Sequence, residues 1–278
     1  MFRNWKSATG FVIIALFIVI AIFAPFIAKS QPQAEIYPLN LPPSGAHLLG
    51  TNSLGQDVFS QLIYGTRVSL LVAFAAGVLT TFISLVVGIT AGYLRGIVDN
   101  ILNWITNVFI VMPGLPLLII VSSYWNTKSE WPIILIISMT SWAYGARSLR
   151  AQTLTLRERD YVLHARLVGR SWWKVVGAEI LPNMLSLVIS GLLFSMIGAL
   201  LAEAGLDFLG LGNVNTVSWG VMLYWAQNNE AMVNGLWWWF VPPGAAIAMF
   251  GGALALINFS IDEITNPRLG RKKVKLNG

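Results

Sequence analysis

Carboxylates beside long apolar stretches are the residues of this chain that could do chemistry. Glu203 and Asp207 lie four residues apart at the end of one such stretch, and Asp99 lies between two others. A carboxylate at bilayer depth costs on the order of 3 kcal/mol, so it must face a partner, a cavity or the interface. We expect Glu203 to tie its helix to neighbouring backbone, with a part in a substrate path as the alternative.

Patterns typical of enzymes and cofactor sites are missing from the sequence. It has no cysteine, and we place its two histidines, His47 and His164, on opposite sides of a membrane, where they cannot share a metal ion. No GxxxxGK[ST] run is present to hold a phosphate. We therefore expect a non-catalytic chain that binds no metal or cofactor. If ATP drives it, partner subunits must bind ATP and magnesium and hydrolyse the nucleotide.

The composition indicates an all-α integral membrane protein that forms one domain over residues 1–278. Hydrophobic residues make up 56% of the chain and charged residues only 11%, against about 25% charged in soluble domains. The third apolar segment is broken at Pro113, so we expect it to face protein or a water-lined path. Six spans are predicted, at residues 11–28, 68–94, 101–122, 131–144, 184–201 and 237–259.

A polar, proline-rich connection at residues 29–67 separates the first two spans. We expect it to lie outside the membrane and to end in a short interfacial helix around residues 57–64. Asp57 and Arg67 flank that helix, where capping or ion pairing is favoured over contact with a substrate. The core of the permeation unit would then occupy residues 68–261, between short tails at residues 1–10 and 262–278.

A polar, arginine-bearing stretch at residues 161–183 separates the fourth and fifth spans. Thr155 and Glu158 have the spacing of a capping box for a first helix, on which Tyr161, Ala165 and Val168 would form one apolar stripe. We place this helix–turn–helix unit, within residues 152–183, on the membrane surface.

Gly169 should end the first of these helices, because glycine adopts a left-handed conformation at little cost. Ser171 would cap the second helix, and Pro182 would stop it. The apolar stripe predicted on the second helix comprises Trp172, Val175, Val176 and Ile180.

The distribution of basic residues predicts the orientation of the chain. With both termini in the cytoplasm, 15 of the 18 lysines and arginines lie on the inner side, and only Lys29, Arg67 and Lys128 lie outside. Cytoplasmic loops carry such an excess of positive charge. We therefore expect a multi-pass protein of the cell membrane that contacts lipid, with no nucleic acid as a partner.

The stretch at residues 161–183 resembles the EAA loop of ABC importer permeases. That pattern begins with Glu-Ala-Ala, reaches a glycine after three further residues, and closes on a hydrophobic residue and proline. Here Leu163 and His164 stand where the pattern has glutamate and alanine, which puts any salt bridge of that glutamate in doubt. The resemblance implies a coupling loop that contacts an ATP-binding subunit through Leu163, His164, Ala165, Arg166, Gly169, Ser171, Trp172, Leu181 and Pro182.

Three further stretches resemble the C-type permease of the dipeptide, oligopeptide and nickel importers. They are residues 47–71, residues 203–219, where Gly205 and Asp207 replace serines of the family's block, and residues 262–269. The resemblance implies a type I ABC importer fold that pairs with a second permease. Two ATP-binding subunits and an extracytoplasmic substrate-binding protein would complete the assembly.

Peptide import is the function that this resemblance favours, with an oligosaccharide or nickel chelate as the alternative substrate. A transporter of another class, driven by an ion gradient, remains an alternative as well. It would need membrane-embedded acids or paired unwound helices, for which Glu203 and the break from Pro113 to Pro116 are the candidates.

Overall fold

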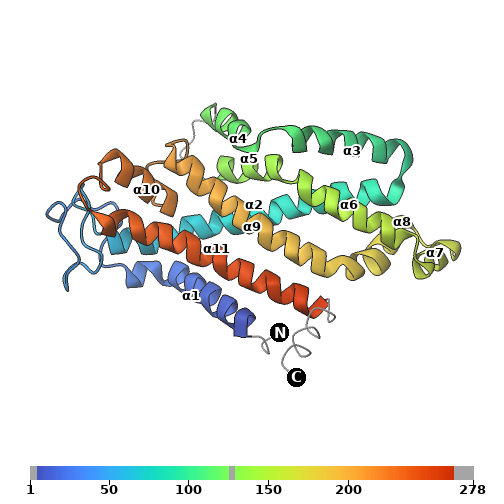
Figure 1. Cartoon of the computed structure of the whole chain (residues 1–278), viewed down its shortest axis with the longest axis horizontal. Coiled ribbons are helices and arrows are strands. Elements are labelled where there is room, and N and C mark those ends of the chain that lie inside the picture. Colours follow the sequence, from blue (N-terminus) through green and yellow to red (C-terminus); the bar gives the residue numbers. More distant parts are fainter. Residues whose placement is uncertain (1–4, 125–128, 266–278) are drawn as a thin grey trace, which may run out of the picture.

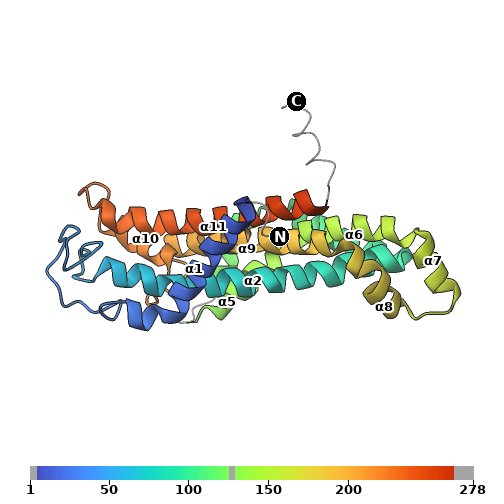
Figure 2. The same ribbon diagram turned by 90° about the horizontal axis from the view of Figure 1, so that it is seen from below.

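The computed structural model describes residues 5–124 and 129–265, and every named element in this part of the chain is a helix. The helices form an elongated bundle, with the loops at residues 28–57 at one end and α7 and α8 at the other (Figures 1 and 2). The helices are α1 Trp5–Ile27, α2 Val58–Leu94, α3 Gly96–Val111, α4 Gly114–Ser123, α5 Trp131–Ser141, α6 Ala143–Arg157, α7 Asp160–Leu167, α8 Trp172–Val175, α9 Leu185–Phe208, α10 Trp219–Asn228 and α11 Trp237–Thr265.

Four helical segments of the described chain are long and apolar enough to cross a membrane: Ser7–Ile27, Val58–Leu94, Trp172–Phe208 and Trp237–Ile261. A fifth candidate is the pair α3 and α4, which meet at an angle of 87° at the predicted break. The apolar helix α5 is too short by itself, although Trp142, with φ −72° and ψ −24°, continues its helical path into α6. The predicted all-α membrane fold is therefore confirmed, and the number of six spans stays a prediction.

The short interfacial helix expected around residues 57–64 is not a separate element. Helix α2 begins at Val58 and runs without interruption to Leu94. It contains no proline, and Gly65 and Thr66, at the expected boundary, are buried in the bundle. Neither a proline nor the packing interrupts the helix there, so the expected interfacial helix and the second span are one continuous helix.

The predicted tails are partly helical. Helix α1 starts at Trp5, inside residues 1–10, and α11 continues to Thr265, inside residues 262–278. Residues 1–4 and 266–278, and with them half of the stretch at residues 262–269, lie outside the described residues, as does Lys128.

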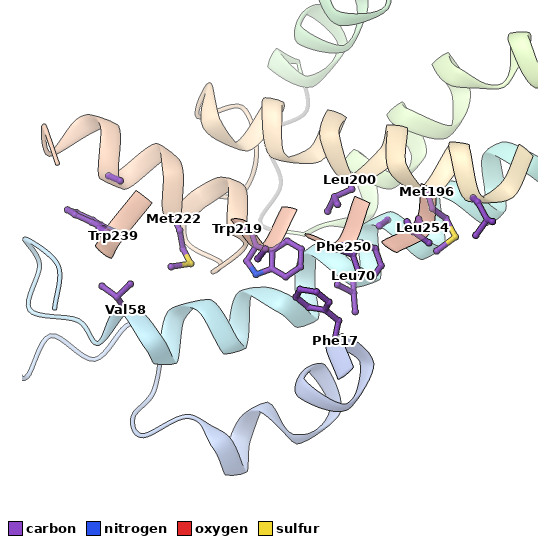
Figure 3. Packing of buried hydrophobic residues seen from close by; sticks show 14 of the residues in the cluster. Phe17, Val58, Leu70, Met196, Leu200, Trp219, Met222, Trp239, Phe250 and Leu254 are labelled. Carbon is purple, nitrogen blue, oxygen red and sulfur yellow. The ribbon is translucent and has the colours of Figure 1, made fainter. Parts of the chain in front are cut away.

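An aromatic cluster fixes α1 and α11 against the rest of the bundle. Phe17 of α1 meets Trp219 of α10 and Phe250 of α11 edge to face, with ring centroids 5.5 Å and 5.6 Å apart (Figure 3). All three side chains are buried, and the indole N–H of Trp219 donates to the carbonyl oxygen of Leu62. Three segments far apart in sequence are thereby joined around α2.

A close helix contact holds α6 against α2 and so positions the elements that follow α6. A Cβ added at Gly88 of α2 would lie 2.6 Å from the carbonyl oxygen of Ala146 in α6. Small residues allow helix backbones to approach in this way inside membranes. The far end of α2 and the end of α6 therefore form one firm platform.

Candidate functional site

The predicted loop forms the end of the bundle opposite the loops at residues 28–57 (Figures 1 and 2). The capping box expected for its first helix is wrong, because Thr155 lies inside α6, where its Oγ1 donates to the carbonyl oxygen of Ala151. Helix α7 instead begins at Asp160, after an extended Arg159 with no side-chain cap. Leu156 packs into the core, which carries α6 past the predicted boundary.

The turn at Gly169 is confirmed. Gly169 has φ +78°, its N–H donates to the carbonyl of Arg166, and the N–H of Arg170 donates to the carbonyl of Ala165. These two bonds make a Schellman motif, in which glycine is favoured at the left-handed position. Ser171 is extended at the start of α8, as expected, but its side chain makes no capping bond. The helix, glycine turn and helix are thus present, and the predicted bond from Ser171 is wrong.

The face of α7 that packs against the platform shares only Ala165 with the predicted stripe. Val162 and Ala165 are buried, whereas Tyr161 and Val168 are exposed. A helix of two turns that begins at Asp160 can bury only one narrow side, and that side faces α2 and α6. In the second stripe Val175 and Ile180 are buried as predicted, while Trp172 is half exposed.

Pro182 does not end a helix. The chain widens into a π turn at Val176–Ile180, tightens into a 3-10 turn at Leu181–Met184 and continues into α9. Pro182 lies in the first positions of the 3-10 turn, where its missing N–H costs little. Asn183 Nδ2 donates to the carbonyl of Glu179 across these irregular turns. The loop is therefore joined to α9 by continuous helical backbone.

Five apolar side chains on α7, the glycine turn and α8 are exposed at this end of the bundle, and we call them together the tip patch. Leu167 and Val168, beside the glycine turn, are 83% and 80% exposed. Exposed apolar surface with a charged rim, here Arg166 and Arg170, is typical of a docking site for another protein. The sequence interpretation did not single out Leu167, and it placed Val168 on the apolar stripe of the first helix. The tip patch consists of Leu163, Leu167, Val168, Trp172 and Trp173.

Two arginine contacts fasten the start of the loop to the end of α2. Arg157 donates from Nη1 to the carbonyl oxygen of Tyr93 and stacks over its ring, while Arg95 pairs with Glu158. Burial lowers the pKa of Arg157, and the nearby charges of Arg166 and Arg95 lower it further. The sequence interpretation did not single out Arg157, whose partner is a backbone carbonyl.

An ion pair links Arg170, which follows the glycine turn, to the π turn, with Arg170 Nη1 2.9 Å from Glu179 Oε1. Exchanging the two charges, Arg170→Glu with Glu179→Arg, is expected to restore the thermal midpoint that either single reversal lowers. Each single change should cost about 0.5 kcal/mol because the pair is largely exposed. Thermal unfolding of the purified protein in detergent measures this. A double variant less stable than both single variants would contradict the pairing.

The buried acids lie at the other end of α9. Ser69 Oγ of α2 donates to Glu203, with its oxygens 3.3 Å and 3.4 Å away, and accepts the backbone N–H of Trp219 at 3.2 Å. Ser218 Oγ donates to Asp207 Oδ2 and caps α10 by accepting from the N–H of Val221. Glu203 therefore has the structural role that was expected, but its partner is a serine hydroxyl and not neighbouring backbone, which is reached only through that hydroxyl.

The remaining acids are also held by structural partners. Asp57 caps α2 through the N–H of Ser60 at 2.8 Å and lies 2.9 Å from the ring of His47, which confirms the capping role. Asp99 accepts from Arg150 Nη2 at 2.8 Å and joins α3 to α6. Outside the spans, burial raises the pKa of Glu130, against the lowering effect of hydrogen bonds from Thr216 and Asn213.

Arg67 and Pro113 are both exposed on the surface of this chain. Arg67 lies on α2. Pro113 precedes α4 at the sharp bend, whose neighbours Val111 and Leu115 are exposed on the surface of this chain. If this bend contacts protein, as expected, another subunit must provide the contact.

Comparison with known proteins identifies the family. Residues 84–271 match the model of the binding-protein-dependent transport system inner membrane component, and residues 1–43 match the N-terminal TM domain of oligopeptide transport permease C. The chain belongs to this family of inner membrane transport components. The resemblance drawn from the coupling loop and the three other stretches is thereby confirmed.

Curated relatives cover nearly the whole chain. A putative peptide transport system permease protein of Brucella abortus is 33% identical over 97% of this chain and 90% of its own length. The dipeptide transport system permease protein DppC of Bacillus subtilis is 30% identical over 97% and 84%, respectively. The oligopeptide transport system permease protein OppC of Lactococcus lactis is 31% identical over 92% and 88%.

Proposed function

We propose that this chain is one of two permease subunits of an ATP-driven importer that takes up peptides. The observation that carries the proposal is the tip patch, an exposed apolar surface on a short helical unit that is fastened to α2, α6 and α9. A surface connected in this way can transmit the movement of a docked protein to the membrane helices. The peptide and oligopeptide systems named for the relatives support the substrate class.

In this proposal an ATP-binding subunit docks on the tip patch and the turn beside it. The contacts involve Leu163, Trp172 and Arg166, with Gly169 and Pro182 shaping the unit. ATP favours a closed pair of ATP-binding subunits, and the rigid unit converts that preference into an outward-facing path, since a ligand shifts an equilibrium by its differential affinity for the two states. ATP and magnesium bind to the partners and not to this chain.

The assembly and its orientation complete the proposal. A second, homologous permease and two ATP-binding subunits join this chain in the membrane, and an extracytoplasmic binding protein delivers the peptide. Helix α5 and the start of α6 make the fourth of six spans, both termini are cytoplasmic, and residues 29–67 lie outside. The basic residues concentrated on the inner side support this orientation.

Affinity purification followed by reconstitution tests the proposal. We expect the tagged chain to retain a second permease and ATP-binding subunits, and vesicles holding this complex and its binding protein to accumulate labelled peptide only with ATP. A protonophore should leave that uptake unchanged. Recovery of the chain alone, with uptake that the protonophore abolishes, would instead establish an ion-driven transporter.

A further inference from the structure

A groove of about 580 Å³ runs along the middle of the bundle, lined mainly by α2, α6 and α9 with one residue each from α5 and α11. Its position on three membrane helices places it at bilayer depth, and hydroxyl side chains line it. Lipid tails offer such groups no hydrogen bonds, so hydroxyls gathered at this depth are typical of a surface that faces another helix or a water-filled path. The serine and threonine residues among them are Thr81, Ser84, Ser141, Ser148, Ser190 and Ser195, and Tyr144 adds a phenolic hydroxyl.

Several of these hydroxyls already use their hydrogens within the chain. Thr81 Oγ1 donates to the carbonyl of Gly77 at 2.8 Å, Ser84 Oγ to that of Trp142 at 2.7 Å, and Ser148 Oγ to that of Tyr144 at 3.2 Å. A hydroxyl has one donor and two acceptor lone pairs. What these residues offer the groove is therefore acceptor oxygen.

An amide oxygen adds to this acceptor character. Asn258 of α11 lines the groove and is only 3% exposed, yet its Oδ1 has no hydrogen-bond partner among the described residues. Leaving a buried acceptor unsatisfied costs about 1–3 kcal/mol, so a donor that enters the groove and reaches this oxygen would be stabilised.

We infer that this groove is one wall of the peptide path and that it binds the N–H groups of the peptide main chain. The inference rests on the proposed function and names the residues that touch the substrate. Every peptide other than polyproline carries main-chain N–H donors, whatever its side chains. The described residues that line the groove carry no charge, so the wall does not sort peptides by side-chain charge. Many weak hydrogen-bond acceptors bind the peptide without holding it tightly. The peptide can then leave the groove as readily as it enters, as conduction requires.

Filling the groove tests its place in the path. Gly198 of α9 lines it and has open space where a Cβ would point, so the leucine side chain of Gly198→Leu starts into open space and obstructs the groove. The matched control is Gly252→Leu, an exposed helical glycine of α11 that also has open space and does not line the groove. In the reconstituted complex we expect Gly198→Leu to slow ATP-dependent peptide uptake at least about tenfold while the complex stays assembled, and the control to transport normally.

A charge placed in the groove tests contact with the substrate directly. The native complex should transport a lysine-containing and a glutamate-containing tripeptide in the ratio set by their delivery from the binding protein. Ser195→Lys is expected to slow the lysine peptide about tenfold relative to the glutamate peptide, the effect of roughly 1.4 kcal/mol of repulsion. Ser195→Ala, which adds no charge, should leave the ratio unchanged.

The outcomes separate the inference from the proposed function. If the native complex shows no ATP-dependent peptide uptake, the proposed function fails. If the native complex transports but Ser195→Lys leaves the ratio of the two peptides unchanged, the groove is not in the path. Loss of the second permease from the Gly198→Leu complex would make the groove a contact between permeases, which also overturns the inference.

Discussion

Replacing both Leu167 and Val168 with aspartate is expected to release the ATP-binding subunits from the complex. The two side chains are 83% and 80% exposed, so their replacement leaves the packing of this chain intact. In the docked state they would be desolvated against the partner, where a carboxylate without a counter-ion is costly. We expect a loss of about 3 kcal/mol in association, or roughly a hundredfold in affinity. The measurement is the amount of ATP-binding subunit that copurifies with the tagged chain, together with ATP-dependent uptake.

Leu48→Asp is the matched control for this double variant. Leu48 is an exposed leucine of the segment between α1 and α2, at the other end of the bundle, so its replacement should leave the copurified ATP-binding subunit unchanged. The second permease should still copurify with the double variant, which shows that the chain is folded. Full retention of the ATP-binding subunits by the double variant would mean that the tip patch is not their docking surface.

Gly212→Ala is expected to destabilise the protein strongly. The segment after α9 turns back over that helix, and a Cβ added at Gly212 would lie 1.7 Å from Asp207 Oδ1. Asp207 has little room to move, because Ser218 donates to its other oxygen and Gly220 packs against its Cβ. Overpacking in such a site typically costs 1–3 kcal/mol, and this overlap falls at the upper end, about 3 kcal/mol. The expected fall of the thermal midpoint is roughly 6–12 °C.

Two variants make this result specific to the contact between residues 212 and 207. Gly205→Ala in α9 has open space around its Cβ and should be neutral or raise the midpoint slightly, because alanine is the better helix former. Combining Gly212→Ala with Asp207→Ala should cost less than the sum of the single variants, because the second change removes the oxygen that the new methyl group would strike. Strict additivity would show that the two residues do not interact.

The sequence predicted the features that depend on local chemistry. The glycine turn follows from the left-handed conformation that glycine adopts at Gly169, and the bend before α4 follows from Pro113. The cap at Asp57 involves a partner three residues away, so local reasoning was sufficient there too. Predictions failed where a residue with the right local chemistry was already used elsewhere, as with Thr155, whose hydroxyl bonds within α6.

Composition and periodicity also determined that this is a helical membrane protein, because apolar helices satisfy their own backbone hydrogen bonds in lipid. Only the tertiary structure decided which side of each helix is covered. On a helix as short as α7 the apolar residues fit more than one face, and the platform of α2 and α6 selects Val162 and Ala165. The same long-range packing leaves Leu167 and Val168 exposed for a partner and brings the groove hydroxyls of four helices together.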